Sequence, residues 1–336
     1  MSAEVIGSGF RIAGTGSALP ERVVTNDEIV EMIKAGDHPK RNKANARWIT
    51  AFTGIETRYF ADPENEDETT AGLSIRSARQ AQERAEFDPD SVDLVIVATM
   101  TTDEVLPQTS AKVQRDLGLK RAEFFDLDLA CTGFVKAVTV ANAMMAAYGL
   151  KRALVVGTDR ADAVTDYTDM MTAPLFGAAS GAIALEAVKD GRGMVSRSTI
   201  NRGDMGYILN APKGKMVMDG QAVKELGIEA MTQNGLAVLK EAGKSPGEIS
   251  RIIFHQANIN MITEVSDNMG IPRREDGSLN TDVVPITINF AGNSSAGTVG
   301  LTFDKSVAER PLQEGEFLVF NGVGGGVAAE AHGIQA

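Results

Sequence analysis

The order of apolar segments along the chain predicts an α/β protein made of two similar β/α halves. Residues 92–99 (VDLVIVAT) form a continuous apolar run after Asp88-Pro89, as expected for a strand buried on both faces of its sheet. Residues 249–254 (ISRIIF) follow Ser245-Pro246 in the same way. Two halves with the same order favour two sheets stacked around shared helices, with a ligand site where the halves meet.

The repeat continues through the rest of each half. A polar residue lies at a strand-to-helix step in both, Cys131 in the first half and Asn293 in the second. These two residues stand 42 and 47 positions after the prolines that introduce the strands. Two further pairs of strands match, namely residues 152–157 with 316–320 and residues 181–188 with 326–331. We therefore divide the chain into an N-terminal half, residues 1–188, and a C-terminal half, residues 189–336.

The first half also contains the signals of several helices. Residues 10–16 are predicted to form a strand, and Thr25-Asn26-Asp27 caps a helix that runs to about Lys34. Residues 35–46 are polar and basic, which favours an exposed loop. Two more helices are expected, at residues 68–85 and 110–117. Strands and helices thus alternate, as an α/β fold requires.

The only cysteine of the chain lies in the segment 126–134 (DLDLACTGF). Residues 122–129 are predicted to form a strand, and residues 133–148 a buried helix that ends at Gly149. Cys131 is therefore expected at the start of a helix, where unpaired N–H groups stabilise a thiolate and lower the thiol pKa. A lone cysteine is as often a small buried apolar residue, so this placement alone leaves its role open.

Composition and charge argue against several classes of function. Apolar residues make up 43% of the chain and charged residues 23%, which is typical of a globular protein. The formal net charge of −12, without a basic stripe, argues against a nucleic-acid partner. No apolar run reaches 18 residues and no signal-peptide pattern is present, so we expect no membrane partner. The single cysteine fits a reducing cytoplasm, and the three histidines are too scattered to suggest a metal site.

Three stretches of the second half carry candidate site residues. His255 directly follows the predicted strand 249–254, at the end where α/β proteins place their ligands. Asn293 lies in a tight glycine turn (AGNSSAG), and residues 321–326 (NGVGGG) offer backbone N–H groups that no side chain covers. Each stretch also has an ordinary explanation, as a core histidine, a helix cap or a flexible turn. None of them establishes a site by itself.

Taken together and in this order, the stretches resemble the thiolase-like condensing enzymes, and most closely 3-oxoacyl-(acyl-carrier-protein) synthase III, the beta-ketoacyl-ACP synthase III type. The resemblance runs from Ile12 nearly to the C-terminus. It includes VATMTT, FDLDLACTGF, ALVVGTD, LFGAASGA, MDGQAV, HQAN, AGNSSAG and GVGGGV. It implies a thiolase-like fold in which two duplicated halves form a five-layered αβαβα sandwich.

The resemblance places the family's catalytic triad on Cys131, His255 and Asn293. It places the oxyanion hole on the N–H groups of Cys131 and Gly325. The implied reaction transfers an acyl group from acyl-CoA to the thiol, after which a malonyl thioester loses CO₂ and forms the new C–C bond. Neutral His255 and the Asn293 amide would stabilise the enolate. Coenzyme A thioesters are substrates in this scheme, and no cofactor or metal is implied.

The same resemblance assigns four residues to substrate binding. Trp48 matches the position that stacks on the adenine of coenzyme A, although a tryptophan there also serves as a core anchor. Leu106 matches a residue that shapes the acyl pocket across the interface of a homodimer. Asn258 of HQAN and Phe176 of LFGAASGA complete the set. The acceptor would be malonyl-CoA or a malonyl acyl carrier protein.

Several positions depart from the housekeeping members of the family. Cationic residues that would hold coenzyme A and the carrier protein are replaced by Phe52, Met170, Glu225 and Asn260. Three lysines could rebuild the patch in a shifted position, namely Lys213, Lys215 and Lys224. The departures leave open whether the enzyme serves fatty-acid initiation or a specialised pathway. They predict weak use of a housekeeping malonyl carrier protein, and better use of a dedicated carrier or a small free acceptor.

Two other functions compete with decarboxylative condensation. The first is acyl transfer from Cys131 to an amine, an alcohol or another thioester without loss of CO₂, which the sequence leaves open. The second is a subunit that binds acyl chains without chemistry, and the intact triad argues against it. Thiolases use two cysteines and elongating synthases use two histidines, whereas this chain has one cysteine and His332 lies outside the matching stretch.

Overall fold

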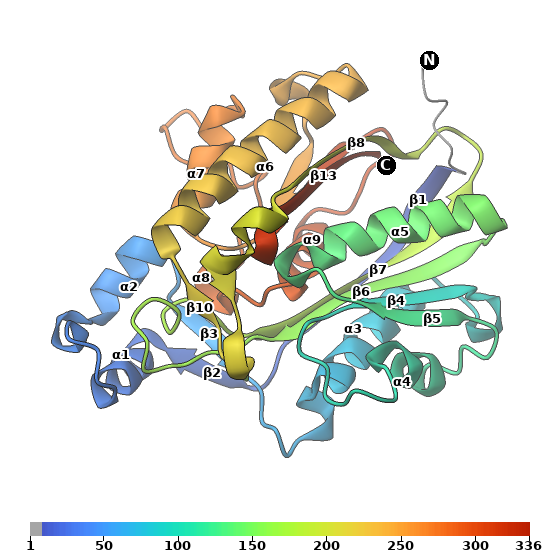
Figure 1. Ribbon diagram of the computed structural model, residues 1–336. Helices are drawn as coiled ribbons and strands as arrows, with labels where there is room; N and C mark the ends of the chain where they lie inside the picture. Colours follow the sequence, from blue (N-terminus) through green and yellow to red (C-terminus); the bar gives the residue numbers. More distant parts are fainter. Residues whose placement is uncertain (1–8) are drawn as a thin grey trace.

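The computed structural model describes residues 9–336 and contains two stacked β-sheets (Figure 1). The first sheet has five strands in the order β1-β7-β6-β4-β5. β4 is parallel to β5 and β6, whereas β7 is antiparallel to both β1 and β6. The strands are Gly9–Ala18 (β1), Leu94–Ala98 (β4), Glu123–Leu127 (β5), Arg152–Arg160 (β6) and Ala178–Val188 (β7).

The second sheet repeats this pattern with four strands in the order β11-β12-β13-β8. They are Gly193–Asn201 (β8), Arg251–Phe254 (β11), Phe317–Gly324 (β12) and Ala328–Gln335 (β13). β11 and β12 are parallel, and β13 is antiparallel to both β12 and β8. The predicted matches of β4 with β11, β6 with β12 and β7 with β13 are therefore confirmed. The chain passes from the first sheet to the second between Val188 and Gly193.

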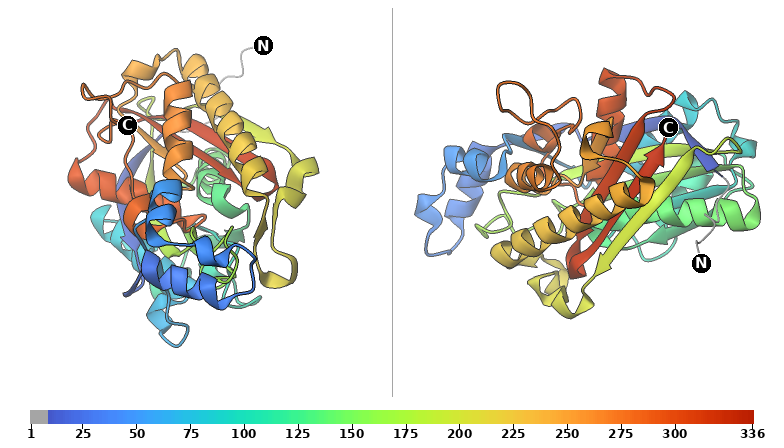
Figure 2. Two further views of the ribbon diagram at one scale, coloured as in Figure 1. Left: turned by 90° about the vertical axis from the view of Figure 1, so that its left-hand side faces the viewer. Right: turned by 90° about the horizontal axis from the view of Figure 1, so that it is seen from above.

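The helices complete the five-layered αβαβα sandwich that the resemblance implied (Figures 1 and 2). Two helices lie between the sheets, α5 (Gly133–Tyr148) and α9 (Gly297–Glu309). The outer face of the first sheet is covered by α3 (Thr70–Arg84) and α4 (Thr109–Asp116). The outer face of the second sheet is covered by α6 (Gly220–Ala242) and α7 (Ile259–Asn268).

Shorter elements gather at the end of the sandwich where α2 and β10 lie (Figure 1). The helices among them are α1 (Asn26–Ala35), α2 (Ala46–Thr53) and α8 (Ile288–Ala291). The strands are β2 (Arg22–Thr25), β3 (Thr57–Phe60), β9 (Leu209–Asn210) and β10 (Val217–Met218). The expected capping of α1 is present, because Thr25 and Glu28 form a capping box. Of these elements, α2, β9 and β10 contribute Phe52, Leu209 and Met218 to the lining of the cavity described below.

The middle layer is the main core of the protein. Phe134 of α5, Phe303 of α9 and Phe320 of β12 belong to one fully buried cluster that joins the two sheets. The segment Ala130–Tyr148 has the length and composition of a membrane-spanning helix, and half of that window is buried. No other helix in residues 9–336 meets this criterion. The position of α5 between two sheets accounts for its apolar composition.

The start of α9 lies unusually close to the first sheet. A Cβ atom on Gly157 of β6 would stand 2.3 Å from the carbonyl oxygen of Ala296, and one on Gly181 of β7 would stand 2.1 Å from the nitrogen of Leu301. No real Cβ atom tolerates such distances to backbone atoms, so both positions require glycine. This contact fixes the loop before α9 against the first half of the chain.

The strands and helices predicted from the sequence are present, with ends that differ by a few residues. The helix expected at residues 68–85 begins at Thr70, and the one expected at 110–117 begins at Thr109. The pattern did not indicate β8, because this edge strand carries alternating polar residues (GMVSRSTIN) rather than an apolar run. Beside β11, at the position where the first sheet has β5, the second sheet has irregular chain. There the N–H of Ile252 donates to the carbonyl of Val283 (2.7 Å).

Candidate active site

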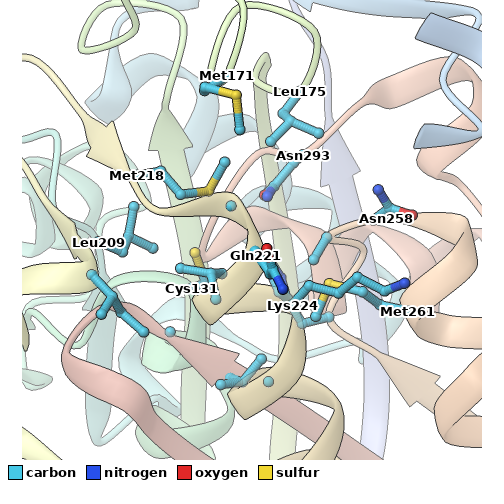
Figure 3. Close-up of a pocket in the computed structure, with 18 of the residues that line it drawn as sticks. Cys131, Met171, Leu175, Leu209, Met218, Gln221, Lys224, Asn258, Met261 and Asn293 are labelled. Carbon is cyan, nitrogen blue, oxygen red and sulfur yellow. The ribbon is translucent and has the colours of Figure 1, made fainter. Parts of the chain in front are cut away.

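An apolar cavity of about 370 Å³ lies where the two halves meet, and Cys131, His255 and Asn293 all line it. Figure 3 shows Cys131 and Asn293 in this cavity. Its volume falls within the range of pockets that hold small ligands. The walls are mainly apolar, with Met171, Leu175, Phe176, Ile208, Leu209, Met218, Val223, Met261, Val323 and Val327. The structure therefore brings together the three residues that the sequence separates by up to 162 positions.

Cys131 lies in a 3₁₀ turn, Ala130–Thr132, directly before α5. Ala130 adopts a left-handed conformation (φ 45°), which is uncommon for a residue with a side chain. The hydroxyl of Thr132 donates to the carbonyl of Ala328 (2.6 Å) and ties the turn to the second sheet. The sulfur is thus held at the predicted strand-to-helix step, and the cysteine is 6% exposed.

The environment of the thiol differs from the sequence expectation. Burial raises the pKa of the Cys131 thiol to about 11, and the nearby Asp159 carboxyl adds to the rise. The Ser295 hydroxyl faces the thiol and opposes the shift, although it forms no well-aligned hydrogen bond. The expected lowering of the pKa by the helix start is therefore outweighed by desolvation. At rest the Cys131 side chain is therefore a thiol, and a reaction at its sulfur needs a base.

His255 follows β11 directly, as the sequence predicted. Its backbone N–H donates to the carbonyl of Asn321 (2.8 Å), and its Nδ1 lies 2.7 Å from the hydroxyl of Thr298. The residue is 2% exposed, and burial lowers the pKa of its imidazole to about 3. The imidazole is consequently neutral at ordinary pH and able to accept a proton. Nδ1 is engaged by Thr298, so Nε2 is the nitrogen available to a ligand.

Asn293 lies between α8 and α9, so the strand-to-helix step expected here is a helix-to-helix step. The residue is fixed on both sides. Its N–H donates to the carbonyl of Leu175 (2.9 Å), and its carbonyl accepts from Gly177 N–H (3.0 Å). Its side-chain oxygen accepts from the N–H of Ser295 (2.9 Å), a residue with left-handed backbone (φ 50°). Because Oδ1 is occupied, the amide NH₂ is the end free for a ligand, and Figure 3 shows this side chain pointing into the cavity.

Asp159 is a buried site residue that the sequence analysis did not select. Its carboxyl group accepts from the hydroxyls of Thr99 and Thr101 (both 3.0 Å) and from Met100 N–H (2.8 Å). It also accepts from Ala296 N–H (3.0 Å) at the start of α9, and so joins the two halves beside Cys131. Its place at the end of the buried strand β6, in ALVVGTD, is the signal that could have identified it.

The glycine loop after β12 approaches the nucleophile, as expected. A Cβ atom on Gly324 would stand 3.1 Å from the backbone nitrogen of Cys131. Gly324 lines the cavity, and Gly325, the expected second oxyanion donor, is the next residue in the loop. A side chain at position 324 would crowd the backbone N–H groups of Cys131 and Thr132, so glycine favours this close approach. The assignment of Gly325 remains a prediction.

The four expected substrate-binding residues divide into two groups. Asn258 and Phe176 line the cavity, and Asn258 caps α7 while donating to the carbonyl of Phe52 (3.0 Å). Trp48 stands behind the mouth and stacks on Phe52 (ring centroids 5.9 Å apart), which itself lines the cavity. Leu106 is 70% exposed on a surface loop and does not line the cavity of its own chain.

The positions that depart from the housekeeping pattern are not all at the mouth. Met170 is buried in the cluster around α1, so no cation would be exposed there without rebuilding that core. Asn260 donates to the carbonyl of Phe52 (2.8 Å), and Glu225 accepts from Gln221 on the exposed face of α6. The expectation that Met170 is an entrance residue is therefore wrong.

Two of the three lysines that could replace the missing cations already have partners within the chain. Lys224 lines the cavity and lies 3.6 Å from Glu264, while the ammonium of Lys215 is engaged by the carbonyls of Ala163 and Thr165. The side chain of Lys213 lies outside the described part of the structure.

The second buried histidine lies elsewhere. His332 of β13 contacts Thr139 and Glu330 and does not line the cavity. Within residues 9–336, no group of three or more His, Cys, Asp or Glu side chains could hold a metal ion.

Comparisons with known proteins agree with this arrangement. The family profile described as 3-oxoacyl-[acyl-carrier-protein (ACP)] synthase III matches residues 125–203, and its C-terminal counterpart matches residues 239–335. A beta-ketoacyl-[acyl-carrier-protein] synthase III of Rhizobium meliloti (strain 1021) is 34% identical over 328 residues. The match covers 94% of this chain and 95% of the relative.

Solved structures share the architecture over almost the whole chain. The 3-oxoacyl-[acyl-carrier-protein] synthase III from Aquifex aeolicus VF5 is 28% identical with a TM-score of 0.88, over 98% of this chain and 100% of the other. The priming β-ketosynthase from the R1128 polyketide biosynthetic pathway is 28% identical with a TM-score of 0.87, over 98% and 96%. With a curated relative at 34% identity over nearly its full length, this chain belongs to the 3-oxoacyl-[acyl-carrier-protein] synthase III family.

Proposed function

We propose that this enzyme transfers an acyl group from acyl-CoA to Cys131 and then condenses it with a malonyl thioester, with loss of CO₂. The observation that carries the proposal is the meeting of a thiol, a neutral imidazole and a free amide in one apolar cavity. The relatives include synthases named for acyl carrier proteins and a priming ketosynthase of a polyketide pathway, which supports a chain-initiating reaction.

The first half-reaction requires a base, because burial keeps Cys131 protonated. His255 is neutral, so Nε2 can take the thiol proton as sulfur attacks the acyl carbonyl. The thioester C–S bond of the donor then breaks, and the coenzyme A thiolate leaves with that proton. The N–H groups of Cys131 and Gly325 would stabilise the tetrahedral oxyanion.

The second half-reaction requires hydrogen-bond donors. When the malonyl group loses CO₂, the electron pair of the broken bond moves onto the thioester as an enolate. The amide of Asn293 and an Nε2–H of His255 would donate to the enolate oxygen. The enolate carbon then attacks acyl-Cys131, a C–C bond forms and the acyl C–S bond breaks. The Cys131 thiolate leaves and takes a proton from water that enters the cavity as the product departs.

The walls of the cavity support a thioester substrate with a flexible apolar chain. Methionines on several sides (Met171, Met218 and Met261) can adapt to chains of different shape. At the mouth, the stacked pair Trp48 and Phe52 offers an aromatic face for the adenine of coenzyme A, and Phe52 is 53% exposed. Coenzyme A thioesters would be substrates in this scheme, with no other cofactor. A cytoplasmic location remains a prediction from the single cysteine.

The first prediction concerns Cys131. Wild-type enzyme incubated with a panel of acyl-CoAs should gain one acyl mass per chain, because Cys131 is the only cysteine. Cys131→Ala should gain none, while thermal unfolding should still occur near the wild-type temperature. Intact-protein mass spectrometry makes the measurement. Covalent acylation of the alanine variant would overturn the assignment of the nucleophile.

The second prediction separates the roles of His255 and Asn293. Asn293→Ala should lower malonyl decarboxylation about 10²–10³-fold, as the loss of one oxyanion donor typically does, and leave self-acylation nearly intact. His255→Ala should lower both half-reactions, since the buried thiol loses its base. Release of CO₂ and acylation mass are measured separately.

His38 lies outside the cavity lining and provides the control for this pair, so His38→Ala should change neither half-reaction. Unchanged decarboxylation in Asn293→Ala would favour acyl transfer to an amine, an alcohol or another thioester instead.

The third prediction concerns the acceptor. Carrier proteins are acidic and dock on basic patches, whereas Lys224, which lines the cavity, is paired with Glu264, and its neighbour Glu225 adds a negative charge to the exposed face of α6. A generic malonyl carrier protein should therefore show a high KM that changes little between low and moderate salt. Malonyl-CoA or a dedicated carrier should be used better. Steady-state kinetics that give a low KM for the generic carrier, rising steeply with salt, would contradict this prediction.

The fourth prediction concerns a homodimer, which would place Leu106 against the acyl pocket of a second copy. The edge strand β5 supports it, because Phe124 is 41% exposed and the edge is free to pair within the described chain. Phe124→Glu should lower the mass measured by sedimentation from two chains to one. Leu236→Glu, on the far outer layer (α6), is the control and should leave the mass unchanged. A wild-type monomer with full activity would refute the dimer.

A further inference from the structure

The hydroxyl of Thr298 is the only partner of His255 Nδ1 among the described residues, at a distance of 2.7 Å. Thr298 lies in the first turn of α9, and its Oγ1 is also 3.0 Å from the carbonyl oxygen of Ser295. Thr298 is 1% exposed and His255 is 2% exposed, so water does not replace the hydroxyl. The hydrogen bonding of Nδ1, the imidazole nitrogen on the side away from the cavity, therefore depends on Thr298 alone.

A hydroxyl group can satisfy Nδ1 in two ways. When the hydroxyl proton points to the carbonyl of Ser295, its oxygen accepts a hydrogen bond from Nδ1–H, and Nε2 keeps a lone pair. When the proton points to Nδ1, the hydroxyl donates, and Nε2 carries the proton. A carboxylate in this position would only accept, and a backbone N–H would only donate. Thr298 is therefore compatible with both neutral tautomers of His255.

Building on the function proposed above, we infer that Thr298 is a positioning residue whose hydroxyl lets His255 act as a base in one half-reaction and as a donor in the other. Its distance to Nδ1 and its second contact with Ser295 carry this inference. Thr298 contacts no substrate and acts only through His255.

In the first half-reaction the hydroxyl serves as an acceptor. The Cys131 S–H bond breaks, Nε2 gains the proton, and the imidazole becomes a cation that carries hydrogen on both nitrogens. Its Nδ1–H then needs a buried acceptor, which the oxygen of Thr298 provides while its own proton stays on the carbonyl of Ser295. The departing thiolate takes the proton from Nε2, and His255 returns to neutrality.

In the second half-reaction the hydroxyl serves as a donor. A half-turn of the hydroxyl places its proton on Nδ1 and stabilises the tautomer with hydrogen on Nε2. That N–H donates to the enolate oxygen as CO₂ leaves, and no proton is transferred. The change of tautomer between the half-reactions requires Nε2 to gain a proton from water in the open cavity and Nδ1 to lose its proton. Because the Nδ1 side of the ring is buried, that loss requires a transient opening of the contact with Thr298.

The test compares Thr298→Val, which keeps the shape of the side chain, with Thr298→Ser, which keeps the hydroxyl. Without the hydroxyl, the buried cation of the first half-reaction has an unpaired N–H, which costs more than an unpaired lone pair. Self-acylation of Thr298→Val should fall about ten- to a hundredfold and decarboxylation only a few-fold, whereas Thr298→Ser should stay within about threefold of wild type in both.

Thr139→Val is the matched control, because it removes a partly buried hydroxyl that lies 2.7 Å from the other buried histidine, His332, away from the cavity. It should leave both half-reactions unchanged. Equal activity of Thr298→Val and wild type, or failure of Thr298→Ser to restore self-acylation, would overturn the inference. A wild-type enzyme that performs neither half-reaction would instead refute the proposed function.

A spectroscopic measurement decides the point without turnover and without relying on the variant's folding. With ¹⁵N-labelled histidine, wild-type His255 should populate both neutral tautomers, and a non-decarboxylating malonyl thioester analogue should raise the Nε2–H fraction. In Thr298→Val the Nε2–H form should dominate from the start, because a hydrogen on Nδ1 would have no acceptor. The signals are assigned with His255→Ala. A single tautomer in wild type that the analogue leaves unchanged would overturn the inference.

Discussion

The contact between the start of α9 and the end of the first sheet is the constraint on which the site depends. Asp159 of β6 accepts the N–H of Ala296, and the glycine at position 157 lets the backbone of Ala296 lie against the strand. The carboxyl has four backbone and hydroxyl donors but no cationic partner among the residues described. A buried carboxylate is tolerated only with such donors, so the contact orients both halves at once. Asn293, Ser295 and Thr298 all belong to the segment that this contact fixes.

Electrostatics explain why the resting site carries no charge on its reactive groups. Burial raises the pKa of the thiol and lowers the pKa of the imidazole, so both groups remain neutral over the physiological range. An ion pair between them would have to be desolvated in an apolar cavity, and its formation before substrate binding is disfavoured. Charge then develops only when the substrate carbonyl is present to receive the attack. In the proposed reaction, the backbone N–H groups and the Asn293 amide would stabilise that charge without rearranging, and such an arrangement favours the transition state over the ground state.

Local patterns were sufficient to predict the duplicated halves and to place Cys131, His255 and Asn293 at segment ends or turns, but only the resemblance to the synthase family grouped the three residues into one site. Cys131, His255 and Asn293 stand at the ends of buried segments or in glycine turns, and parallel topology brings such ends together. The hydrogen bonds that orient these side chains join residues far apart in the sequence and follow no local pattern. Thr298 bonds His255 across 43 positions, and Asp159 bonds Ala296 across 137. No periodicity in the chain indicates such pairs, and the same limit explains why Met170 was expected at the mouth although it is buried.

The strained backbone conformations near the cavity also depend on contacts between the two halves. Three non-glycine residues adopt left-handed backbone around the cavity: Ala130 before the nucleophile, Ser295 after Asn293, and Val327 in the glycine loop. Each such conformation costs of order 1 kcal/mol or more and persists only where the surrounding contacts impose it. Here the imposing contacts cross between halves, through Thr132 with Ala328 and Asp159 with Ala296. The strained turns are therefore stable only when both halves are packed together. Neither half alone could hold the site residues in place, so the site forms only in the complete fold.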